Sequence, residues 1–377
     1  MNQENMPTPV TLNDFTRQWH MIREKALAAL DHTGSSGWYI LGEETRTFEA
    51  SLANTCGVAH AIACANGLDA IEMSLRSLGL KQGQRVLTTP HTAFATVLGI
   101  MRAGGTPCFI DTDETGLIDL ELAAQICETR PDITFFLPVH LYGHALPLAQ
   151  LASLRDRFGL TIVEDCAQAI GASSHGQSVG SVGQCSALSF YPTKNLGALG
   201  SGGAVLTNSA DVANHAAMIG NYGQSEKYKH DYYGMNSRID EMQAALLREC
   251  LLPHLTTFTQ TRRQIAARYL QHITHASITL PPIPDGSASV WHLFPVQVEN
   301  REDFREFMRG RGIETGVHYP WLAHQQLALT QNSPYEILSP LPCAEHWAAS
   351  EVSLPIHPFM HPGEVERVID SCNQWRA

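Results

Sequence analysis

Residues 186–203 of this chain read SALSFYPTKNLGALGSGG and carry one lysine, Lys194, on a glycine-rich loop. The apolar residues before Pro192 predict a buried strand that ends there, because proline cannot donate to a strand ladder. The apolar stretch 204–207 predicts a second strand that leaves the loop. Two interpretations follow. The loop is a hairpin with a solvated lysine, or it holds a desolvated amine that is nucleophilic enough to form a Schiff base.

A regular alternation of strands and helices precedes this loop and predicts the fold class. Residues 83–170 alternate between short apolar runs and helical patterns. Such βαβ repetition produces a mostly parallel sheet with helices on both faces, which is an α/β fold. Ligands bind such sheets at the carboxyl ends of the strands. Strands are expected at 58–64, 85–89, 107–110, 133–139 and 161–164.

A carboxylate, Asp165, directly follows the strand predicted at 161–164. At that place it is poorly solvated and needs a cation or several hydrogen-bond donors. Asp165 is either a capping residue at a strand–helix junction or a carboxylate that faces a ligand cation. In the second case we expect Gln168, one helical turn further on, to lie at the opening of the same ligand site.

A second glycine turn follows the strand predicted at 58–64. The segment Asn66-Gly67-Leu68-Asp69 comes directly before a helical pattern. Free N–H groups and the helix dipole at such a start form an anion site. Asn66 as a simple helix cap is the alternative, and it is about as well supported by this segment alone.

The composition limits the partners and the compartment. Acidic residues outnumber basic ones by 37 to 25, giving a charge of −12, which argues against nucleic acid and anionic membranes as partners. We find no membrane-spanning stretch and no signal peptide. The nine cysteines form no Cys-x-x-Cys pair and are interpreted as reduced thiols. We therefore expect a cytoplasmic protein, and no metal at its 18 mostly isolated histidines.

Two domains are expected, a large one over residues 1–252 and a small C-terminal α+β domain over 253–377. The large domain begins with a helix that can pack on the small domain, and residues 221–231 are predicted as a surface loop. A long helix kinked at Pro253 links the domains. The remaining predictions are helices at 12–33, 302–311, 343–351 and 363–375, and strands at 292–298 and 314–318.

Three of these features converge on one cofactor, pyridoxal phosphate. A lysine amine on a shaped loop can form the Schiff base with its aldehyde, as Lys194 would. Asp165 can keep its pyridine nitrogen protonated, which makes the ring an electron sink. The turn at Gly67 and Leu68 can take its phosphate.

The chain resembles the DegT/DnrJ/EryC1/StrS sugar aminotransferases, which are pyridoxal-phosphate enzymes of fold type I, from about Gly37 to its C-terminus. The family's Asp-x-x-Gln motif appears as Asp165 and Gln168, and its serine and lysine appear as Ser189 and Lys194. The resemblance implies that Lys194 and Asp165 are catalytic. It also implies that Ser189 contacts the cofactor phosphate and Gln168 the ring region.

The resemblance further implies a shared active site and a substrate class. The segment Asn236-Ser237-Arg238 matches one that, in this family, comes from the neighbouring subunit to complete the phosphate site, so a homodimer is expected. The donor in the family is usually L-glutamate and the acceptor a nucleotide-linked ketosugar. Residues 221–228 and 66–70 look most like members that aminate dTDP-3-keto-6-deoxyhexoses at carbon 3. The reaction would be ping-pong transamination through a Lys194 Schiff base.

One departure concerns the residue that stacks on the cofactor ring. Many members place an aromatic residue there, whereas this chain is one residue shorter and puts Ala93 at the position. His91 or Phe94 could replace the aromatic ring, and we include His91 among the cofactor-binding residues. A substrate wall is expected from aromatic and hydrogen-bonding side chains, namely Tyr39, Arg238, His318, Tyr319 and His324.

Several alternatives remain open. Within the family they are a sugar 4-aminotransferase and a sugar dehydratase that uses the same cofactor, although the dehydratases carry histidine in place of Lys194. A non-catalytic cofactor-binding regulator is an alternative of another class. A nucleotide-binding oxidoreductase is disfavoured because no Gly-x-Gly-x-x-Gly follows the first strand.

Overall fold

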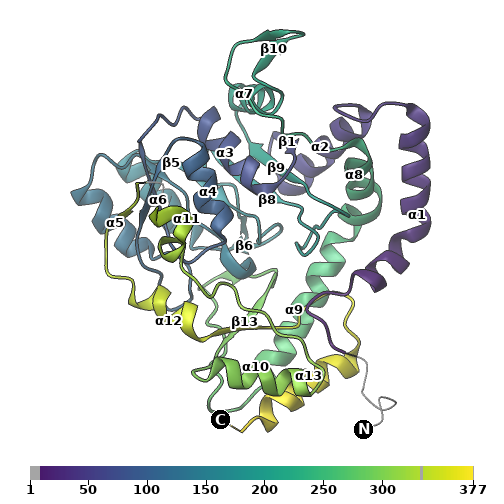
Figure 1. Cartoon of the computed structure of the whole chain (residues 1–377), viewed down its shortest axis with the longest axis vertical. Helices are drawn as coiled ribbons and strands as arrows, with labels where there is room; N and C mark the ends of the chain where they lie inside the picture. The colour runs from purple at the N-terminus through teal and green to yellow at the C-terminus, as the bar shows by residue number, and fades with distance from the viewer. Residues whose placement is uncertain (1–8, 332–333, 377) are drawn as a thin grey trace.

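A computed structural model describes residues 9–331 and 334–376 of the chain (Figure 1). Its centre is an eight-stranded sheet with the order β1-β9-β8-β5-β4-β2-β3-β14. From one edge to the other the strands are β1 (His60–Cys64), β9 (Gly203–Thr207), β8 (Cys185–Ser189), β5 (Thr161–Asp165), β4 (Phe135–Phe136), β2 (Arg85–Thr88), β3 (Thr106–Phe109) and β14 (Glu336–Ile337).

The six strands from β8 to β14 are parallel, whereas β9 is antiparallel to both β8 and β1. The predicted α/β class with a mostly parallel mixed sheet is therefore confirmed. Lys194 lies between β8 and β9, as the two apolar runs predicted. The strand expected at 133–139 is paired only at Phe135 and Phe136 and by a single bridge at Val139.

Helices cover the sheet and bury its apolar residues. Helix α3 packs against β8 and β9 and lies beside α4 and α7, while α5 and α6 pack on each other. The main apolar core lies between these helices and the central strands. Nearly every residue of β2, β3, β5 and β8 is buried in it. The helices are α3 (Gly67–Ser77), α4 (Phe94–Arg102), α5 (Leu120–Thr129), α6 (Leu148–Phe158) and α7 (Ala210–Gly220).

The C-terminal part has an apolar core of its own, formed by residues 265–375 together with Val10. Its strands β13 (Phe294–Gln297) and β15 (Glu351–Leu354) pair antiparallel. The predicted strand at 314–318 is wrong, because only Gly316 pairs there, with Ser353. The predicted helix at 343–351 ends at Ser350, where β15 begins. All four residues of β15 are buried, so the alternation that marks a half-exposed strand is missing from its sequence.

Three helices flank this small sheet, and their predicted positions agree with the structure to about one residue. They are α10 (Arg301–Gly310), α12 (Pro342–Ser350) and α13 (Pro362–Gln374). The predicted kinked helix is also present as α8 (Glu241–Leu246), an irregular turn around Pro253, and α9 (Leu255–His272). In Figure 1, α9 runs from the large sheet region down to α10 and α13.

The N-terminal helix α1 (Phe15–Ser36) joins the two parts of the molecule. It packs mainly against α8. At its start, however, Arg17 forms a two-pronged ion pair with Glu364 of α13, with N–O distances of 2.7 and 2.8 Å. The start of α1 therefore contacts the small C-terminal region. The division at residue 252 stays a prediction.

Residues 221–231, predicted as a loop, form a short hairpin of β10 (Gln224–Glu226) and β11 (Lys229–His230). It projects from the top of the molecule in Figure 1. Nearby Tyr228 and Tyr233 are almost fully exposed. Among the helices that the structure describes, none is both long and apolar enough to cross a membrane.

Candidate active site

The loop after β8 folds back on itself and fixes Lys194. Its backbone N–H donates to the carbonyl of Tyr191 at 2.8 Å. Gly197 has no substitute here, because a Cβ atom on it would lie 2.2 Å from the carbonyl oxygen of Pro192. The next side chain, Asn195, donates to the carbonyl of Val290 at 2.9 Å and so ties the loop to the C-terminal region. Lys194 itself remains partly exposed.

The surroundings of Lys194 favour a reactive amine over a solvated one. Burial lowers the pKa of Lys194 to about 8, and the neighbouring charge of Asp165 partly offsets this. A lower amine pKa leaves more of the free, nucleophilic base at neutral pH. The burial of the amine therefore favours the interpretation as a nucleophilic lysine over that as a solvated hairpin lysine.

Asp165 ends β5 and is held by two donors. Thr96 Oγ1 donates to Oδ2 at 2.8 Å, and the backbone N–H of Ala167 donates to Oδ1 at 3.0 Å. Burial raises the pKa of Asp165, while these bonds and the charge of Lys194 pull it down. Thr96 was not predicted from the sequence. The sequence does contain a hint, because Thr92 and Thr96 are four residues apart and so lie on one side of a helix start. In the structure their hydroxyls are 2.8 Å apart.

Gln168 connects this strand end to the C-terminal region. Its Nε2 donates to the Tyr319 hydroxyl at 3.1 Å, and its Oε1 accepts from the backbone N–H of Tyr142 at 2.7 Å. The Tyr142 hydroxyl in turn donates to the carbonyl of His318 at 2.7 Å. Burial lowers the pKa of His318, and the charge of Lys194 lowers it further, so His318 lies close enough to the amine to share one site with it. We call Lys194, Asp165, Gln168, His318 and Tyr319 the lysine site.

The predicted phosphate turn lies against the end of β8. Asn66 caps α3 by accepting from the N–H of Asp69 at 2.8 Å, which leaves the first helical N–H groups, those of Gly67 and Leu68, without partners inside the helix. A Cβ atom on Gly67 would lie 2.7 Å from Cβ of Ser189. Gly67 therefore lets a helix start and a serine hydroxyl lie side by side, which fits a bound phosphate.

Three predicted residues, Tyr39, Asn236 and Arg238, lie outside the lysine site, and we call the surface that they form the strip. The guanidinium of Arg238 donates to Asn221 at 2.8 Å and to the Tyr222 hydroxyl at 3.1 Å, and it also contacts Asn236. Asn236 and Tyr39 are exposed. Within this chain none of these contacts reaches the lysine site, so the structure does not bring Tyr39, Asn236 and Arg238 together with Lys194.

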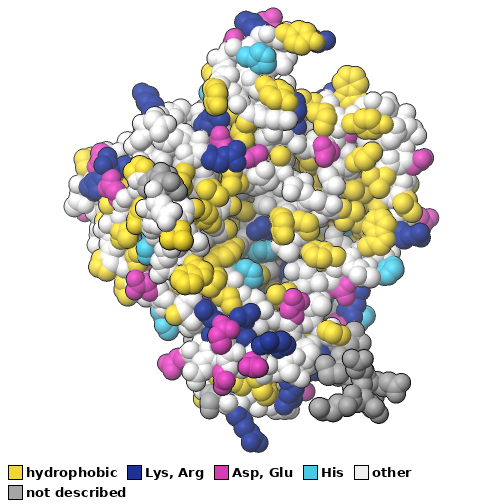
Figure 2. Space-filling model, viewed as in Figure 1, with side chains coloured by type: hydrophobic (Ala, Val, Ile, Leu, Met, Phe, Trp, Pro, Cys, Tyr) yellow, Lys and Arg dark blue, Asp and Glu magenta, His cyan; other side chains and the backbone are white. Residues whose placement is uncertain are grey.

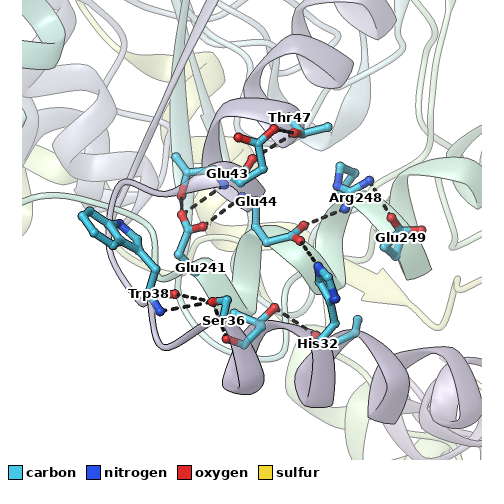
Figure 3. Close-up of polar contacts among 12 residues, drawn as sticks. His32, Ser36, Trp38, Glu43, Glu44, Thr47, Glu241, Arg248 and Glu249 are labelled. Carbon is cyan, nitrogen blue, oxygen red and sulfur yellow. Dashed lines mark hydrogen bonds and ion pairs between the residues drawn. The ribbon is translucent and has the colours of Figure 1, made fainter.

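The buried carboxylate of Glu241 anchors the segment that contains Tyr39, and Figure 3 shows its hydrogen bonds to the start of α2. Glu241 accepts from the N–H groups of Gly42, Glu44 and Thr45 at 2.8–3.1 Å. Its own N–H donates to the carbonyl of Tyr39 at 3.0 Å. The start of α2 (Glu43–Cys56) is thereby tied to the start of α8.

Of the two remaining predicted residues, His91 contacts the Tyr142 hydroxyl that bonds His318, and His324 lies beside Phe109. His91 is buried, with Nδ1 at 3.2 Å from the carbonyl of Gly116 and Nε2 at 3.1 Å from the Tyr142 hydroxyl. His324 packs beside Phe109, with 6.4 Å between the rings. A cofactor or substrate role for either histidine stays a prediction.

One buried group has the composition of a metal site. Ligand atoms of His140, Glu164 and Cys166 lie within 4.8 Å of one another. Glu164, however, already accepts from His140 Nε2 and from three backbone N–H groups of residues 180–183 at 2.7–2.9 Å. Its oxygens thus hold that loop in place, which accounts for the cluster without a metal.

A mostly parallel sheet with a half-buried lysine, an aspartate at a strand end and a helix start that fits a phosphate is typical of a pyridoxal-phosphate enzyme. The sequence profile of the DegT/DnrJ/EryC1/StrS aminotransferase family matches residues 20–373, and the chain belongs to that family. It is therefore a pyridoxal-phosphate-dependent aminotransferase of fold type I.

Individual relatives agree with this assignment. The chain is 39% identical to dTDP-3-amino-3,4,6-trideoxy-alpha-D-glucose transaminase of Streptomyces venezuelae, covering 96% of this chain and 95% of the relative. It is 40% identical to dTDP-3-amino-3,6-dideoxy-alpha-D-galactopyranose transaminase of Aneurinibacillus thermoaerophilus, covering 95% and 98%. The crystal structure of S. venezuelae DesV in complex with a ketimine intermediate superposes with a TM-score of 0.92 at 38% identity, covering 98% and 99%.

Proposed function

We propose that this aminotransferase moves an amino group from L-glutamate to carbon 3 of a dTDP-linked 3-keto-6-deoxyhexose, working as a homodimer. The observation that carries the proposal is the Lys194 amine, whose pKa burial lowers, beside the Asp165 carboxylate. The substrate class is supported by the similarity to two dTDP-3-amino-sugar transaminases.

The residues of the lysine site can be given roles toward the cofactor. The N–H groups of Gly67 and Leu68 and the Ser189 hydroxyl would hold its phosphate, and Asp165 would hold its pyridine nitrogen. Pyridoxal phosphate supplies an electron sink that stabilises the carbanion left when the donor α-carbon loses its proton. Every other part of the reaction falls to side chains of the protein.

Lys194 performs the proton transfer. Its amine, with a pKa of about 8, can take the proton from the donor α-carbon as a base and return one as an acid at neutral pH. Thr96 and Ala167 orient the Asp165 carboxylate by donating to both of its oxygens, and these bonds favour its ionised form. Gln168 is held in one orientation because it accepts from the N–H of Tyr142 and donates to the hydroxyl of Tyr319.

The homodimer is supported by an exposed apolar surface around the strip. Trp38, Tyr39, Leu41 and Met242 are between 38% and 63% exposed although they are large and apolar or aromatic. Figure 2 shows hydrophobic side chains gathered over the side of α1, α2 and α8. Such a patch marks an interaction surface. A second copy seated there would bring a partner surface to Asn236 and Arg238.

A regulator without catalysis has some support from the relatives. The chain is also 39% identical to the erythromycin biosynthesis sensory transduction protein EryC1 of Saccharopolyspora erythraea. Lys194 and Asp165 favour the enzyme, because a protein that only bound the cofactor would need neither a proton acceptor nor an electron sink.

The test is an assay of the holoenzyme with L-glutamate and a panel of dTDP- and UDP-linked 3- and 4-ketosugars. We expect 2-oxoglutarate release that depends on a dTDP-3-ketosugar, and a product that mass and proton couplings identify as the 3-amino sugar. Amination at carbon 4, or a preference for UDP-sugars, would replace the proposed substrate. Absence of 2-oxoglutarate with every sugar would favour the regulator.

A further inference from the structure

A fully buried carboxylate, Glu351, lies behind the lysine site at the start of β15. Its Oε2 accepts from the backbone N–H of His318 at 2.6 Å, and its Oε1 lies 2.5 Å from the hydroxyl of Ser353. Burial raises the pKa of Glu351 to about 8, against the bonds from Ser353 and His318 and the charges of Arg301 and Arg305. Glu351 can therefore carry a proton at neutral pH.

The Ser353 hydroxyl links Glu351 to the ring of His318. Its oxygen is 2.9 Å from His318 Nδ1 and 2.5 Å from Glu351 Oε1. A hydroxyl has one proton, so it donates in one direction at a time. With Glu351 ionised, Ser353 donates to the carboxylate, and Nδ1–H donates to Ser353. With Glu351 protonated, the carboxyl donates to Ser353, which donates to Nδ1, and the neutral ring carries its proton on Nε2.

The other ring nitrogen is the one available to a ligand. Burial and the charge of Lys194 lower the pKa of His318 to about 4, so the ring is neutral at working pH. Of the residues that the structure describes, none forms a hydrogen bond with Nε2. The ring is partly exposed, and the adjacent Tyr319 reaches Gln168.

We propose that Glu351 and Ser353 are positioning residues that set the tautomer of His318. Nε2 then offers the sugar substrate a hydrogen-bond donor when Glu351 is protonated and an acceptor when Glu351 is ionised. The choice of ligand rests on the proposed function, whereas the control of the tautomer does not.

The switch takes up one proton in balance. A proton from solvent binds Nε2, the Nδ1 proton passes to Ser353 Oγ, and the former hydroxyl proton passes to Glu351 Oε1. The Nε2–H and Glu351 O–H bonds form, the Nδ1–H bond breaks, and the O–H bond of Ser353 is broken and formed again, so one proton is gained in total. Glu351, which solvent does not reach, is thus titrated through His318.

Other titratable groups face this chain of hydrogen bonds. The charges of Arg301 and Arg305 of α10 lower the pKa of Glu351. Burial raises the pKa of Tyr142 and Tyr319, and the charge of Glu351 adds to both shifts, as does that of Asp165 for Tyr319. Lys194 and His292 lie beyond His318. Because Lys194 titrates in the same pH range, a pH profile alone does not identify Glu351, and a substitution is needed.

The experiment uses the holoenzyme with ring-¹⁵N-labelled histidine, in which long-range ¹H–¹⁵N spectra distinguish the Nδ1–H and Nε2–H forms. The His318 signals are assigned as those lost in His318→Asn. Wild type is expected to change from Nε2–H near pH 6.5 to Nδ1–H near pH 9.5. Glu351→Gln keeps an acceptor for the His318 N–H but donates permanently toward Ser353, so it is expected to stay Nε2–H throughout.

Glu302→Gln is the matched control, because Glu302 is an exposed carboxylate that also pairs with Arg301 and Arg305. It is expected to behave as wild type. The proposal is overturned if Glu351→Gln and wild type show the same tautomer at pH 9.5. Should Glu351→Gln fail to fold, Ser353→Thr must keep the wild-type switch and Ser353→Ala must abolish it, and the opposite result overturns the proposal.

A kinetic readout tests the link to the sugar. Reversing one hydrogen bond to the substrate is expected to change the rate of the ketosugar half-reaction by about tenfold and to leave the glutamate half-reaction unchanged. Equal effects of Glu351→Gln on both half-reactions would contradict the assignment to the sugar. Failure of wild type to aminate any sugar would instead refute the proposed function, and the tautomer measurement would still stand.

Discussion

At the scale of single residues, the amine of Lys194 and the carboxylate of Asp165 set the chemistry. Each is perturbed by burial, and each acts on the other: Lys194 lowers the pKa of Asp165, and Asp165 raises that of Lys194. This mutual effect favours the ionised form of the carboxylate against the upward shift that burial gives its pKa, and it partly offsets the effect of burial on the amine. Two predictions belong to this scale.

Lys194→Ala is expected to abolish turnover, because no other amine takes the proton at the donor α-carbon. It should also abolish cofactor that borohydride fixes to the protein, measured by mass spectrometry after reduction. Lys81→Ala is the control, because Lys81 is exposed and far from Lys194 in the sequence, and this variant should behave as wild type. Wild-type turnover in Lys194→Ala would refute the role of Lys194.

Thr96→Val removes the hydroxyl that donates to Asp165 while keeping the shape of the side chain. A hydrogen bond to a charged group contributes about 1.5–3 kcal/mol, so kcat should fall about 10- to 100-fold. The bond favours the ionised carboxylate, so its loss raises the pKa of Asp165. The acid limb of the pH–rate profile should therefore move to higher pH.

Thr96→Ser is the matched variant, since it keeps the hydroxyl and should retain most of the rate. Equal losses in the serine and valine variants would show that packing around Thr96, rather than its hydrogen bond, supports activity.

At the scale of elements, helix starts position most of the site. The first turn of α3 lies against β8 because residue 67 has no side chain, and α2 is held by a carboxylate from α8. At α2 the unpaired N–H groups of a helix N-terminus bind an anionic side chain, which stabilises the local geometry.

Glu241→Gln tests the second of these contacts. An amide cannot replace a carboxylate that accepts from three backbone N–H groups, so about 1–3 kcal/mol of stability should be lost. The melting temperature should fall by about 5 °C. Glu249→Gln removes an exposed carboxylate that pairs with Arg248, and it should change the melting temperature little. A similar fall in both variants would argue against an anchoring role for Glu241.

At the scale of the whole molecule, the proposed dimer explains two features of the surface together. The hydrogen bonds of Asn236 and Arg238 do not reach the lysine site of their own chain, and exposed apolar side chains such as Trp38 and Met242 belong to the same region. A stable interface buries about 800 Å² on each partner, which a patch of several large side chains can supply.

The double variant Trp38→Asp/Met242→Asp should therefore give a monomer with little activity, because charges in a buried apolar interface are costly. Light scattering coupled to size-exclusion chromatography measures the mass. Ile337→Asp places one charge on β14, at the opposite edge of the sheet from β1, and should leave the dimer intact. An active monomer would contradict a shared active site.

The two strands that flank Lys194 in the chain, and the place of Asp165 at the end of a strand, could be predicted from the sequence, because both depend on local signals. Apolar runs bounded by proline and glycine mark buried strands, and a polar residue after such a run lies at the sheet edge. The turn at Gly67 was predictable for the same reason, since a strand, a glycine and a helical period are consecutive in the chain.

Contacts between distant segments could be decided only by the tertiary structure. Thr96 lies on Asp165 because α4 and β5 pack together, and Glu351 reaches His318 because β15 runs beside residues 316–318. Neither pair has a spacing that a sequence pattern records. The sequence therefore determined which groups carry the chemistry. The packing of distant elements decided which groups hold them, since burial and hydrogen bonding depend on neighbours in space.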